Sequence, residues 1–521
     1  MRLHDYFDFS AREYPDTAFA VLGDRTMSYR EASGEVNRLA NALIGAGLKP
    51  GDRIAMLSKN SIEYALMYYA ASKAGVAPVP MNYRLAPPEW TYIINDAQAK
   101  LVITSAAYTE AVDGLKGDLK TAKQFICLGG AAPAGWQEYG SFVEGQPLTP
   151  PDRHVGLDDD AYQMYTSGTT GQPKGAVLTH GAVSAQLTQV EPIAQARPGE
   201  RFLIVAPLYH AAAAVTAFSA VKWGSTLYIQ EDFNPVEVVR ALAEERIGIA
   251  LLVPAMIQAL LVYVPDVASR SYGDLRRIIY GASPIAEQTL RRAAEVFKCG
   301  FAQAYGMTET TAVLTALLSE HHEIALRDRP ELLLSAGRAI VGVDLRIVDE
   351  DDVQVEPGGF GEITARGPNI MRCYWNLADE SAEALRGGWM HTGDAGYMDA
   401  EGFLFVQDRV KDMIVSGGEN VYPRNIEDAL FKHPAIADVA VIGVPDKQWG
   451  ETVKAIVVLK DGQQATDEEV MSFCKDKLGG FQRPRSVDFI AELPRNASGK
   501  VLKKELRAPY WAGEKRRVAG S

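Results

Sequence analysis

Apolar residues recur along this chain at two alternating spacings, and the change of spacing predicts helices and strands in turn. Apolar side chains at helical spacing over 36–43 predict a helix that ends near Gly45. A strand over 53–57, a helix over 61–73 and a strand over 76–79 are expected next. Because such a strand–helix–strand order joins parallel strands, this region predicts a parallel sheet covered by helices.

The same alternation returns in the middle of the chain. Strands are predicted over 202–206 and 226–230, with an alanine-rich helix after His210 between them. The longest apolar stretch, 247–264, contains Pro254, which divides it into a strand and a short helix. We therefore expect this stretch to belong to a buried core and not to a membrane span.

The pattern changes twice toward the C-terminus. Between about 335 and 370 it becomes strand and turn, with a hairpin predicted at 357–359. The composition changes again at Lys411, and beyond it a helix, two strands and a second helix are expected. We therefore predict two domains, 1–410 and 411–521.

Composition and charge exclude some classes of protein. The chain has 521 residues, which is enough for roughly three or four domain-sized units. Its net charge of −13 argues against a nucleic-acid-binding protein, because such proteins need a basic surface. The 4 cysteines are scattered without a metal-binding pair, and no signal peptide is apparent, so we expect a cytoplasmic protein.

The segment 165–175 reads Tyr-Thr-Ser-Gly-Thr-Thr-Gly-Gln-Pro-Lys-Gly and lies between two predicted strands, 161–165 and 176–178. Its glycines free backbone N–H groups to point at an anion, its hydroxyls add donors, and Lys174 adds charge. The expected ligand is a polyphosphate, although the spacing is not that of the common P-loop. A flexible Ser/Thr/Gly linker is the alternative explanation.

Three further motifs follow in order: Tyr-Gly-Met-Thr-Glu at 305–309, Thr-Gly-Asp at 392–394 and Ser-Gly-Lys at 498–500. Each alone has an ordinary explanation, namely a helix cap at Thr308, an aspartate in a tight turn and a surface lysine. Together with the glycine-rich loop and a hinge near Lys411, they resemble the signature of adenylate-forming enzymes. This family contains acyl-CoA synthetases, non-ribosomal adenylation domains and beetle luciferases, and the resemblance covers nearly the whole chain.

The resemblance implies an α/β fold: a large N-terminal domain of two α/β subdomains plus a β-rich subdomain, and a small mobile α+β C-terminal domain. It also implies an ATP site, in which Tyr305 would stack on adenine and Thr308 would contact the α-phosphate. Asp394 and Arg409 would hold the ribose, since a carboxylate can accept from both hydroxyls of a vicinal diol. The nucleotide-binding residues implied are Thr166, Ser167, Gly168, Thr169, Thr170, Lys174, Gly281, Ala282, Ser283, Ala304, Tyr305, Gly306, Thr308, Asp394, Arg409 and Lys411.

The same resemblance implies the catalytic residues. Lys500 would bridge the substrate carboxylate and the α-phosphate, because a compact ammonium offsets the repulsion between these negative groups. Glu309 and Thr166 would ligate Mg²⁺, a cation that prefers a carboxylate plus water when it bridges phosphates. The catalytic set is therefore predicted to be Lys500, Thr166, Glu309 and His210.

Residues beyond the hinge suggest the acyl acceptor. In relatives that use coenzyme A, a glycine in the loop after the hinge lets the pantetheine arm pass close to the backbone, and Gly418 takes that place here. Trp449 matches a segment near the thiol tunnel, with a core or rim aromatic as the alternative. Gln482 stands where many relatives carry a lysine, so Arg483 or Arg485 is expected to contact the CoA nucleotide instead.

The acyl pocket is expected around the segment that starts at His210, which would border the substrate carboxylate. A purely structural histidine is the alternative. Small apolar walls suit an elongated or flat hydrophobic acid, and no arginine is placed to bind a second carboxylate. The predicted wall residues are His210, Ala211, Ala214, Ile257, Tyr280, Gly281, Gly306 and Val313.

These implications predict an ATP-dependent acyl-CoA ligase that needs ATP, Mg²⁺ and coenzyme A and favours a medium- or long-chain fatty acid. The alternatives are an aryl or cinnamate-type carboxylate–CoA ligase, an enzyme that loads a carrier protein, and a catalytically silent nucleotide-binding regulator. Neither a nucleic-acid partner nor a transmembrane segment is expected. Peripheral membrane contact and a homodimer stay open, as does the identity of the acid.

Overall fold

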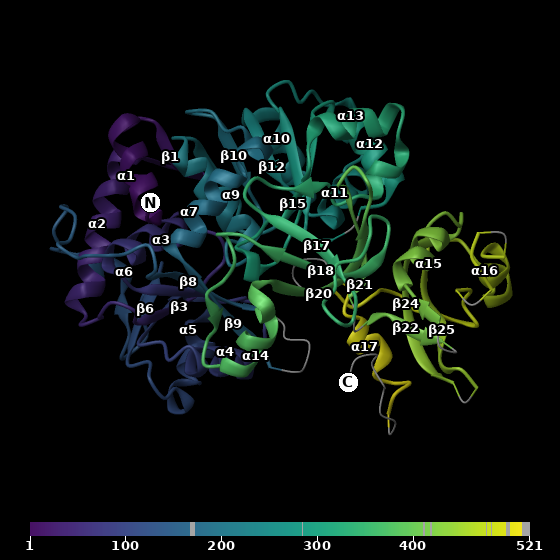
Figure 1. The fold of residues 1–521 in the computed structure, drawn as a ribbon. Helices are drawn as coiled ribbons and strands as arrows, with labels where there is room; N and C mark the ends of the chain where they lie inside the picture. The colour runs from purple at the N-terminus through teal and green to yellow at the C-terminus, as the bar shows by residue number, and fades with distance from the viewer. Residues whose placement is uncertain are drawn as a thin grey trace.

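The computed structural model of the chain describes residues 1–166, 172–283, 285–409, 412–416, 419–446, 448–475, 477–480, 482–495 and 501–512, without the side chains of 408, 409, 419, 420 and 425. A large α/β body forms most of the molecule, and a small α+β unit formed by the C-terminal residues lies at one side of it (Figure 1). The fold is therefore the one that the sequence predicts.

Two mainly parallel sheets build the large body. The first runs in the order β16-β15-β14-β13-β12-β10-β11-β1-β2, and its strands from β14 to β1 are parallel to their neighbours. Its strands are β1 (Ala18–Leu22), β2 (Arg25–Ser28), β10 (Arg201–Ile204), β11 (Thr226–Ile229), β12 (Ile247–Leu251), β13 (Arg277–Gly281), β14 (Gly300–Tyr305), β15 (Thr315–Leu317) and β16 (Arg338–Ala339). The second, parallel sheet has the order β4-β3-β5-β6-β7. Its strands are β3 (Arg53–Leu57), β4 (Ala77–Pro80), β5 (Leu101–Ser105), β6 (Gln124–Leu128) and β7 (Gln137–Glu138).

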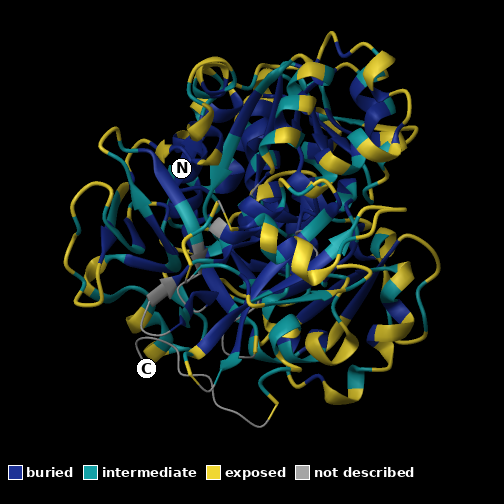
Figure 2. Cartoon of the chain, turned by 90° about the vertical axis from the view of Figure 1, so that its right-hand side faces the viewer, coloured by how far each residue is buried: buried dark blue, intermediate teal, exposed yellow. Residues whose placement is uncertain are grey.

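Helices pack between these sheets and on their outer faces, and the residues that they bury lie in the interior of the molecule (Figure 2). The central core contains residues of both sheets and of α1 (Leu3–Glu13), α2 (Tyr29–Gly45), α3 (Ile62–Ala74), α7 (His180–Gln189) and α9 (Ala211–Lys222). Apart from Glu63, every residue of α3 is buried, as expected for a helix that is apolar on all sides. Successive residues of β10 face different cores, with Phe202 on the central one and Leu203 on the outer one. Burial on both faces explains the uninterrupted apolar runs of these strands.

The strand–helix–strand prediction near the N-terminus is confirmed. β3 spans the expected 53–57, α3 begins after an N-cap at Ser61, and β4 pairs with β3 in parallel. Hydrogen bonding of the Ser61 side chain to the amide of Tyr64 and a left-handed Gly75 define the two ends of α3. Pro254 divides the long apolar stretch as predicted, because it stands at the first position of α11 (Pro254–Tyr263).

The glycine-rich segment joins β8 (Asp160–Thr166) and β9 (Lys174–Thr179), which pair antiparallel as the predicted strand–loop–strand. The short β19 (Cys373–Tyr374) extends this hairpin on the other side of β9. A four-stranded antiparallel sheet follows, in the order β17-β18-β20-β21. Its strands are β17 (Asp344–Val348), β18 (Phe360–Arg366), β20 (Met390–Met398) and β21 (Leu404–Arg409).

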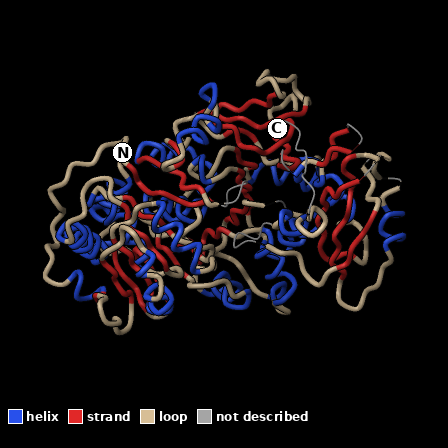
Figure 3. Tube along the Cα trace, turned by 90° about the horizontal axis from the view of Figure 1, so that it is seen from below, coloured by secondary structure: helices blue, strands red, loops and turns tan. Residues whose placement is uncertain are grey.

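The C-terminal unit has its own sheet, whose strands lie apart from those of the large body (Figure 3). The sheet contains β22 (Ile414–Ser416), β23 (Glu419–Val421), β24 (Ile436–Asp446), β25 (Gly450–Leu459) and β26 (Ser486–Phe489). It packs with α15 (Pro423–Leu430), α16 (Asp467–Phe473) and α17 (Lys503–Arg507). The boundary predicted between 410 and 411 falls directly after β21 and stays a prediction, because residues 410 and 411 lie outside the described residues.

The remaining α-helices are α4 (Pro87–Asp96), α5 (Ala106–Asp113), α6 (Tyr139–Val143), α8 (Glu191–Ala194), α10 (Pro235–Glu244), α12 (Glu287–Phe297), α13 (Ser319–Arg327) and α14 (Ala378–Ala384). Among all helices within the described ranges, none is both long enough and apolar enough to cross a membrane.

Candidate active site

A cleft of about 1510 Å³ collects the segments in which the sequence places the chemistry. Four neighbouring parallel strands (β10, β12, β13 and β14) bring the residues at or after their carboxyl ends to it. The carboxyl edge of a parallel sheet is the usual place for a ligand in an open α/β fold. The β8–β9 hairpin, the four-stranded sheet and part of the C-terminal unit complete the lining.

One polar contact joins the first two motifs. Glu309 lies in the 3-10 helix η3 (Thr308–Thr310) and is buried. Its Oε1 accepts a hydrogen bond from Thr166 Oγ1 at 3.3 Å and another from the Tyr374 hydroxyl at 2.8 Å. The ammonium of Lys174 lies 5.2 Å from the centre of the Tyr374 ring. The predicted residues Thr166, Lys174 and Glu309 are thus brought together around a tyrosine that no motif indicates.

The base of the glycine-rich segment is anchored from both strands. The Tyr165 hydroxyl donates to Asp96 Oδ2 at 2.5 Å and accepts from Gln163 Nε2 at 3.0 Å. On the other strand, the Gly175 carbonyl accepts from the Trp375 amide at 2.7 Å. Thr166 and Lys174, which flank the segment, are therefore held in place. The predicted phosphate-binding residues Ser167, Gly168, Thr169 and Thr170 lie outside the described residues.

A second contact joins the motif at 305–309 to the Thr-Gly-Asp motif at 392–394. The Tyr305 hydroxyl, at the end of β14, donates to Asp394 Oδ2 in β20 at 2.8 Å. Arg409, in β21, is the backbone partner of Asp394 across the sheet. The residues predicted to bind adenine and ribose are therefore neighbours in space, although 89 positions separate Tyr305 from Asp394.

Two glycines of the predicted set have a structural reason to be glycine. A Cβ at Gly281 would lie 2.2 Å from the carbonyl oxygen of Ala304, and a Cβ at Gly306 would lie 2.2 Å from that of Ala312. Real Cβ atoms do not come so close to a carbonyl, so the backbone would have to move. Both glycines line the cleft, as do Ala282, Ser283, Ala304 and Thr308.

The predicted acyl side of the cleft is lined by small side chains of α9 and by the ends of β12 and β13. His210, Ala211, Tyr280 and Val313 line the cleft as predicted, together with Ala212 and Ala213. Ala214 and Ile257 do not: both are fully buried in the hydrophobic cores. Ala214 is buried because the inner face of α9 packs into the central core, and Ile257 because α11 turns that face toward the outer core.

His210 and Tyr280 differ in what they can offer a substrate. Nε2 of His210 is buried without a hydrogen-bond partner among the described residues. Burial, with a smaller effect from the charge of Arg84, lowers the pKa of His210 to about 4, so the ring is neutral at pH 7. The Tyr280 hydroxyl instead meets Nε2 of His322 at 2.8 Å. Because Nδ1 of His322 donates to the Leu318 carbonyl, Nε2 must accept from Tyr280, whose hydroxyl is thereby occupied.

The C-terminal unit closes one end of the cleft. Arg495 and Val501 form an isolated β-bridge and both line the cleft, as do Arg424 and Lys503. The segment between the bridge residues carries Lys500, which lies outside the described residues with Lys411 and Gly418. The described neighbours of Lys500 on the chain therefore line the same cleft as the residues of the predicted nucleotide site. Trp449 lies elsewhere on the unit, with the guanidinium of Arg485 4.7 Å from its ring centre and away from the cleft lining.

The donor set around Glu309 fits magnesium. Mg²⁺ binds proteins through one or two carboxylates and takes its other ligands from phosphates and water. Glu309 supplies a buried carboxylate, and Thr166 supplies a hydroxyl beside it. No histidine or cysteine competes in this contact, so the chemistry of the side chains present suits a hard cation that arrives with a nucleotide.

Comparison with known proteins finds relatives over nearly the whole chain. The model of the AMP-binding enzyme family matches residues 7–375, and that of the AMP-binding enzyme C-terminal domain matches residues 425–500. The fatty acid–acyl-carrier-protein ligase ScoC of Streptomyces coeruleorubidus is 36% identical over 98% of this chain and 96% of its own. The feruloyl-CoA synthase of an Amycolatopsis species is 37% identical over 96% and 97%. A solved structure titled Mycobacterium tuberculosis fatty acyl CoA synthetase has a TM-score of 0.78 at 33% identity and covers 99% of both chains.

Proposed function

The chain belongs to the AMP-binding enzyme family, as an AMP-forming acid–thiol ligase, and we propose that it converts a hydrophobic carboxylic acid to its CoA thioester. The observation that carries the proposal is the contact of Thr166 with Glu309, because it joins the phosphate-binding and metal-binding motifs at one cleft. Tyr305 and Asp394 extend the same wall toward a nucleoside.

In the first half-reaction, a carboxylate oxygen of the acid attacks the α-phosphorus of ATP. The bond from this phosphorus to the pyrophosphate oxygen breaks, which leaves acyl-AMP and pyrophosphate. Tyr305 and Asp394 hold the nucleoside, Thr166 and the glycine-rich segment hold the phosphates, and Lys500 offsets the charge that gathers between the two reactants. Glu309 and Thr166 would hold Mg²⁺, which neutralises phosphate charge when it is bound.

In the second half-reaction, the thiol sulfur of CoA attacks the acyl carbonyl carbon, AMP leaves, and the thiol loses its proton. Lys500 is no longer needed at that stage. We propose that the C-terminal unit turns about Lys411, withdraws Lys500 and brings the Gly418 loop to the cleft. Trp449 and Arg485 support this reading, since they place an aromatic ring and a cation together on the unit, away from the present cleft.

For the acid, we favour a medium- or long-chain fatty acid. The small side chains of α9 line the cleft beside His210 and leave room for an apolar chain, and one relative is a fatty acid ligase by name. The names of the relatives differ both in the acid and in the acceptor. One is a feruloyl-CoA synthase, and the fatty acid ligase is named for a carrier protein as its acceptor. An aromatic acid is therefore the second candidate for the acid, and a carrier-bound phosphopantetheine the second candidate for the acceptor.

The decisive experiment measures pyrophosphate release with a panel of acids, followed by thioester formation with free CoA. Release that requires a fatty acid, and thioester yield that saturates with free CoA, support the proposal. Release with cinnamate- or benzoate-type acids alone would move the assignment to aryl–CoA ligase, and thioester formation only on a carrier protein would replace CoA. Absence of any acid-dependent release would contradict the whole assignment and favour a silent nucleotide-binding regulator.

A further inference from the structure

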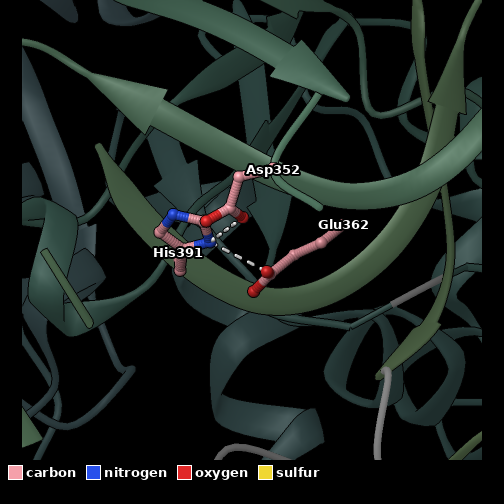
Figure 4. A group of neighbouring side chains, drawn as sticks. All are labelled: Asp352, Glu362 and His391. Atoms are coloured by element: carbon pink, nitrogen blue, oxygen red, sulfur yellow. Dashed lines mark hydrogen bonds and ion pairs between the residues drawn. The ribbon is translucent and has the colours of Figure 1, made fainter. Parts of the chain in front are cut away.

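A cluster of charged side chains contacts the stretch of chain just before Asp394, and three of them, Glu362, Arg386 and His391, line the same cleft. Glu362 of β18 accepts hydrogen bonds from Nδ1 of His391 (Figure 4) and from the amide of Gly393, both at 2.9 Å. Nδ1 of His391 also lies 3.8 Å from Asp352 Oδ1. Both hydrogen bonds of Glu362 are therefore made with the residues just before Asp394, so Glu362 can influence the position of Asp394.

The backbone shows why Glu362 matters there. β18 and β20 pair regularly over two stretches. The first ends where Glu362 pairs with Ala395, and the second begins where Thr364 pairs with His391. Between these pairs, the single residue Ile363 lies opposite 392–394, which form a bulge of β20. A bulge removes amides from the regular ladder and leaves them to find other partners. The carboxylate of Glu362 reaches across the bulge to the Gly393 amide, which precedes Asp394.

Other bonds complete the bulge. The Thr392 hydroxyl donates to the Ile363 carbonyl at 2.7 Å and lies 3.1 Å from the Asp394 amide, which donates to it. Gly393 adopts a left-handed backbone with φ of +68°, a conformation that glycine reaches without strain. The conformation before Asp394 is thus fixed on one side by Thr392 and on the other by Glu362.

A metal ion is a poorer explanation of the cluster. Ligand atoms of Asp352, Glu362 and His391 do lie within 4.8 Å of one another. The guanidinium of Arg386, however, lies 3.0 Å from Asp352 and 3.3 Å from Glu362. An arginine already balances both carboxylates, which places the cluster among structural networks. The hydrogen bonds from His391 and Gly393 outweigh the effect of burial and lower the pKa of Glu362, so its carboxylate stays charged at neutral pH.

We propose that Glu362 is a positioning residue for nucleotide selection: through the Gly393 amide it sets the bulge that aims Asp394 at the ribose hydroxyls. The inference rests on the proposed function, in which Asp394 accepts from those hydroxyls. Glu362 itself touches no substrate in this scheme. Its loss should therefore change how strongly the enzyme prefers a ribose over a deoxyribose, and leave recognition of the acid as it is.

The test compares kcat/KM for ATP with that for 2′-deoxy-ATP and 3′-deoxy-ATP, in acid-dependent pyrophosphate release by the full chain. The native enzyme should prefer ATP by about 10-fold or more, because a site built to bind a hydroxyl rejects an analogue without it. Glu362→Ala should reduce this preference to below about 2-fold, with KM for the acid unchanged. Glu362→Gln keeps an acceptor for Gly393 and should retain most of the preference. Asp352→Asn is the matched control from the same cluster and should retain it fully.

The outcomes separate the two hypotheses. If Glu362→Ala does not fold, Glu362→Asp takes its place, because a side chain shorter by one methylene cannot reach the Gly393 amide. If Asp394→Ala loses the preference while Glu362→Ala and Glu362→Asp both retain it, the positioning role alone is overturned. Retention of the preference in Asp394→Ala would overturn the ribose assignment, and the positioning role with it.

Discussion

Two walls of one cleft are built on different principles. On the proposed nucleotide wall, formed around Glu309 and Asp394, side chains from distant segments hydrogen-bond one another: Thr166 and Tyr374 donate to Glu309, and Tyr305 donates to Asp394. On the proposed acyl wall, formed by 210–213 and the ends of β12 and β13, the side chains are mostly apolar, and those of the three alanines at 211–213 are small. Nε2 of His210 has no partner there among the described residues.

The difference tells which property each wall determines. Polar groups that already hydrogen-bond one another need little rearrangement when a charged ligand binds. Such a wall therefore suits one reaction that is the same for every acid. A wall of small apolar groups sets only the size and shape of what fits, and each methylene changes affinity modestly. We therefore expect variants of the nucleotide wall to slow the reaction of every acid equally, and variants of the acyl wall to change the ranking of acids.

The largest effect is expected from the lysine that the C-terminal unit would add to the nucleotide wall. Lys500→Ala should reduce acid-dependent ATP–pyrophosphate exchange by about 100-fold or more, the cost of removing one group that stabilises developing charge. Attack of CoA on pre-made acyl-adenylate should stay within about 3-fold of the native rate, because in the proposed scheme Lys500 is withdrawn before that step. The exposed Lys504, four residues later, offers the matched control, and equal loss in both half-reactions would argue against this division of labour.

Glu309→Gln tests the nucleotide wall itself. The amide keeps an acceptor for Thr166 and Tyr374 but loses the charge, so the fold should survive while adenylation falls by about 100-fold. The fall should be the same for each acid in a panel, and the Mg²⁺ concentration needed for half-maximal rate should rise. Glu331→Gln removes an exposed carboxylate that also lines the cleft and should leave both quantities unchanged. A changed ranking of acids in Glu309→Gln would break the contrast between the walls.

The nucleotide wall is also the part of the site that sequence could predict. Tyr305, Thr308, Glu309 and Asp394 lie in short motifs that resemble a known family, and the structure gathers all four at the cleft. Regular elements followed equally well from local pattern, as the boundaries of β3 and the break at Pro254 show. Both kinds of signal are carried by residues close together in the chain.

The site residues that the sequence does not predict depend on pairing between segments that are distant in the chain. Tyr374 reaches Glu309 because β19 pairs with β9. The sequence around Tyr374 contains no motif that predicts this pairing. Glu362 meets Gly393 only because a bulge shifts the register between β18 and β20. The resemblance predicts Ala214 and Ile257 as pocket walls, whereas the rotation of α9 and α11 turns them into the cores. Register and helix rotation are set by packing of the whole domain.

Ala212→Trp tests the acyl wall. Ala212 is exposed and lines the cleft in the first turn of α9, so a large side chain there fills the channel without overpacking a core. We expect kcat/KM for long acids to fall by about 10-fold relative to short ones, with KM for ATP unchanged. Tyr280→Phe is the control, since Tyr280 lines the cleft but its hydroxyl is bound to His322. An equal loss for short and long acids would mean that Ala212 does not limit chain length.

The smallest effect is expected from pH, through the protonation of His210. The size of the change in KM for the acid tells whether His210 binds the substrate carboxylate as a neutral or as a charged ring. With a pKa of about 4, His210 is charged in about 1% of molecules at pH 6. KM for the acid should therefore change by less than about 2-fold between pH 8 and pH 6, since the acid itself is ionised at both. A KM that falls several-fold at pH 6, and does so no longer in His210→Asn, would mean that a charged imidazolium binds the carboxylate.

The same shift has a consequence for stability, with a definite sign. In the unfolded chain the pKa of His210 returns to its ordinary value of about 6.5, above the folded value. The unfolded state then binds more protons between pH 6.5 and pH 4, so the contribution of a neutral His210 is complete above pH 6.5 and is lost as the pH falls toward 4. Thermal midpoints measured from pH 7 to pH 4.5 should fall less steeply in His210→Asn than in the native chain. An identical slope would place the imidazole in water and remove the one polar group that distinguishes the acyl wall from a plain apolar channel.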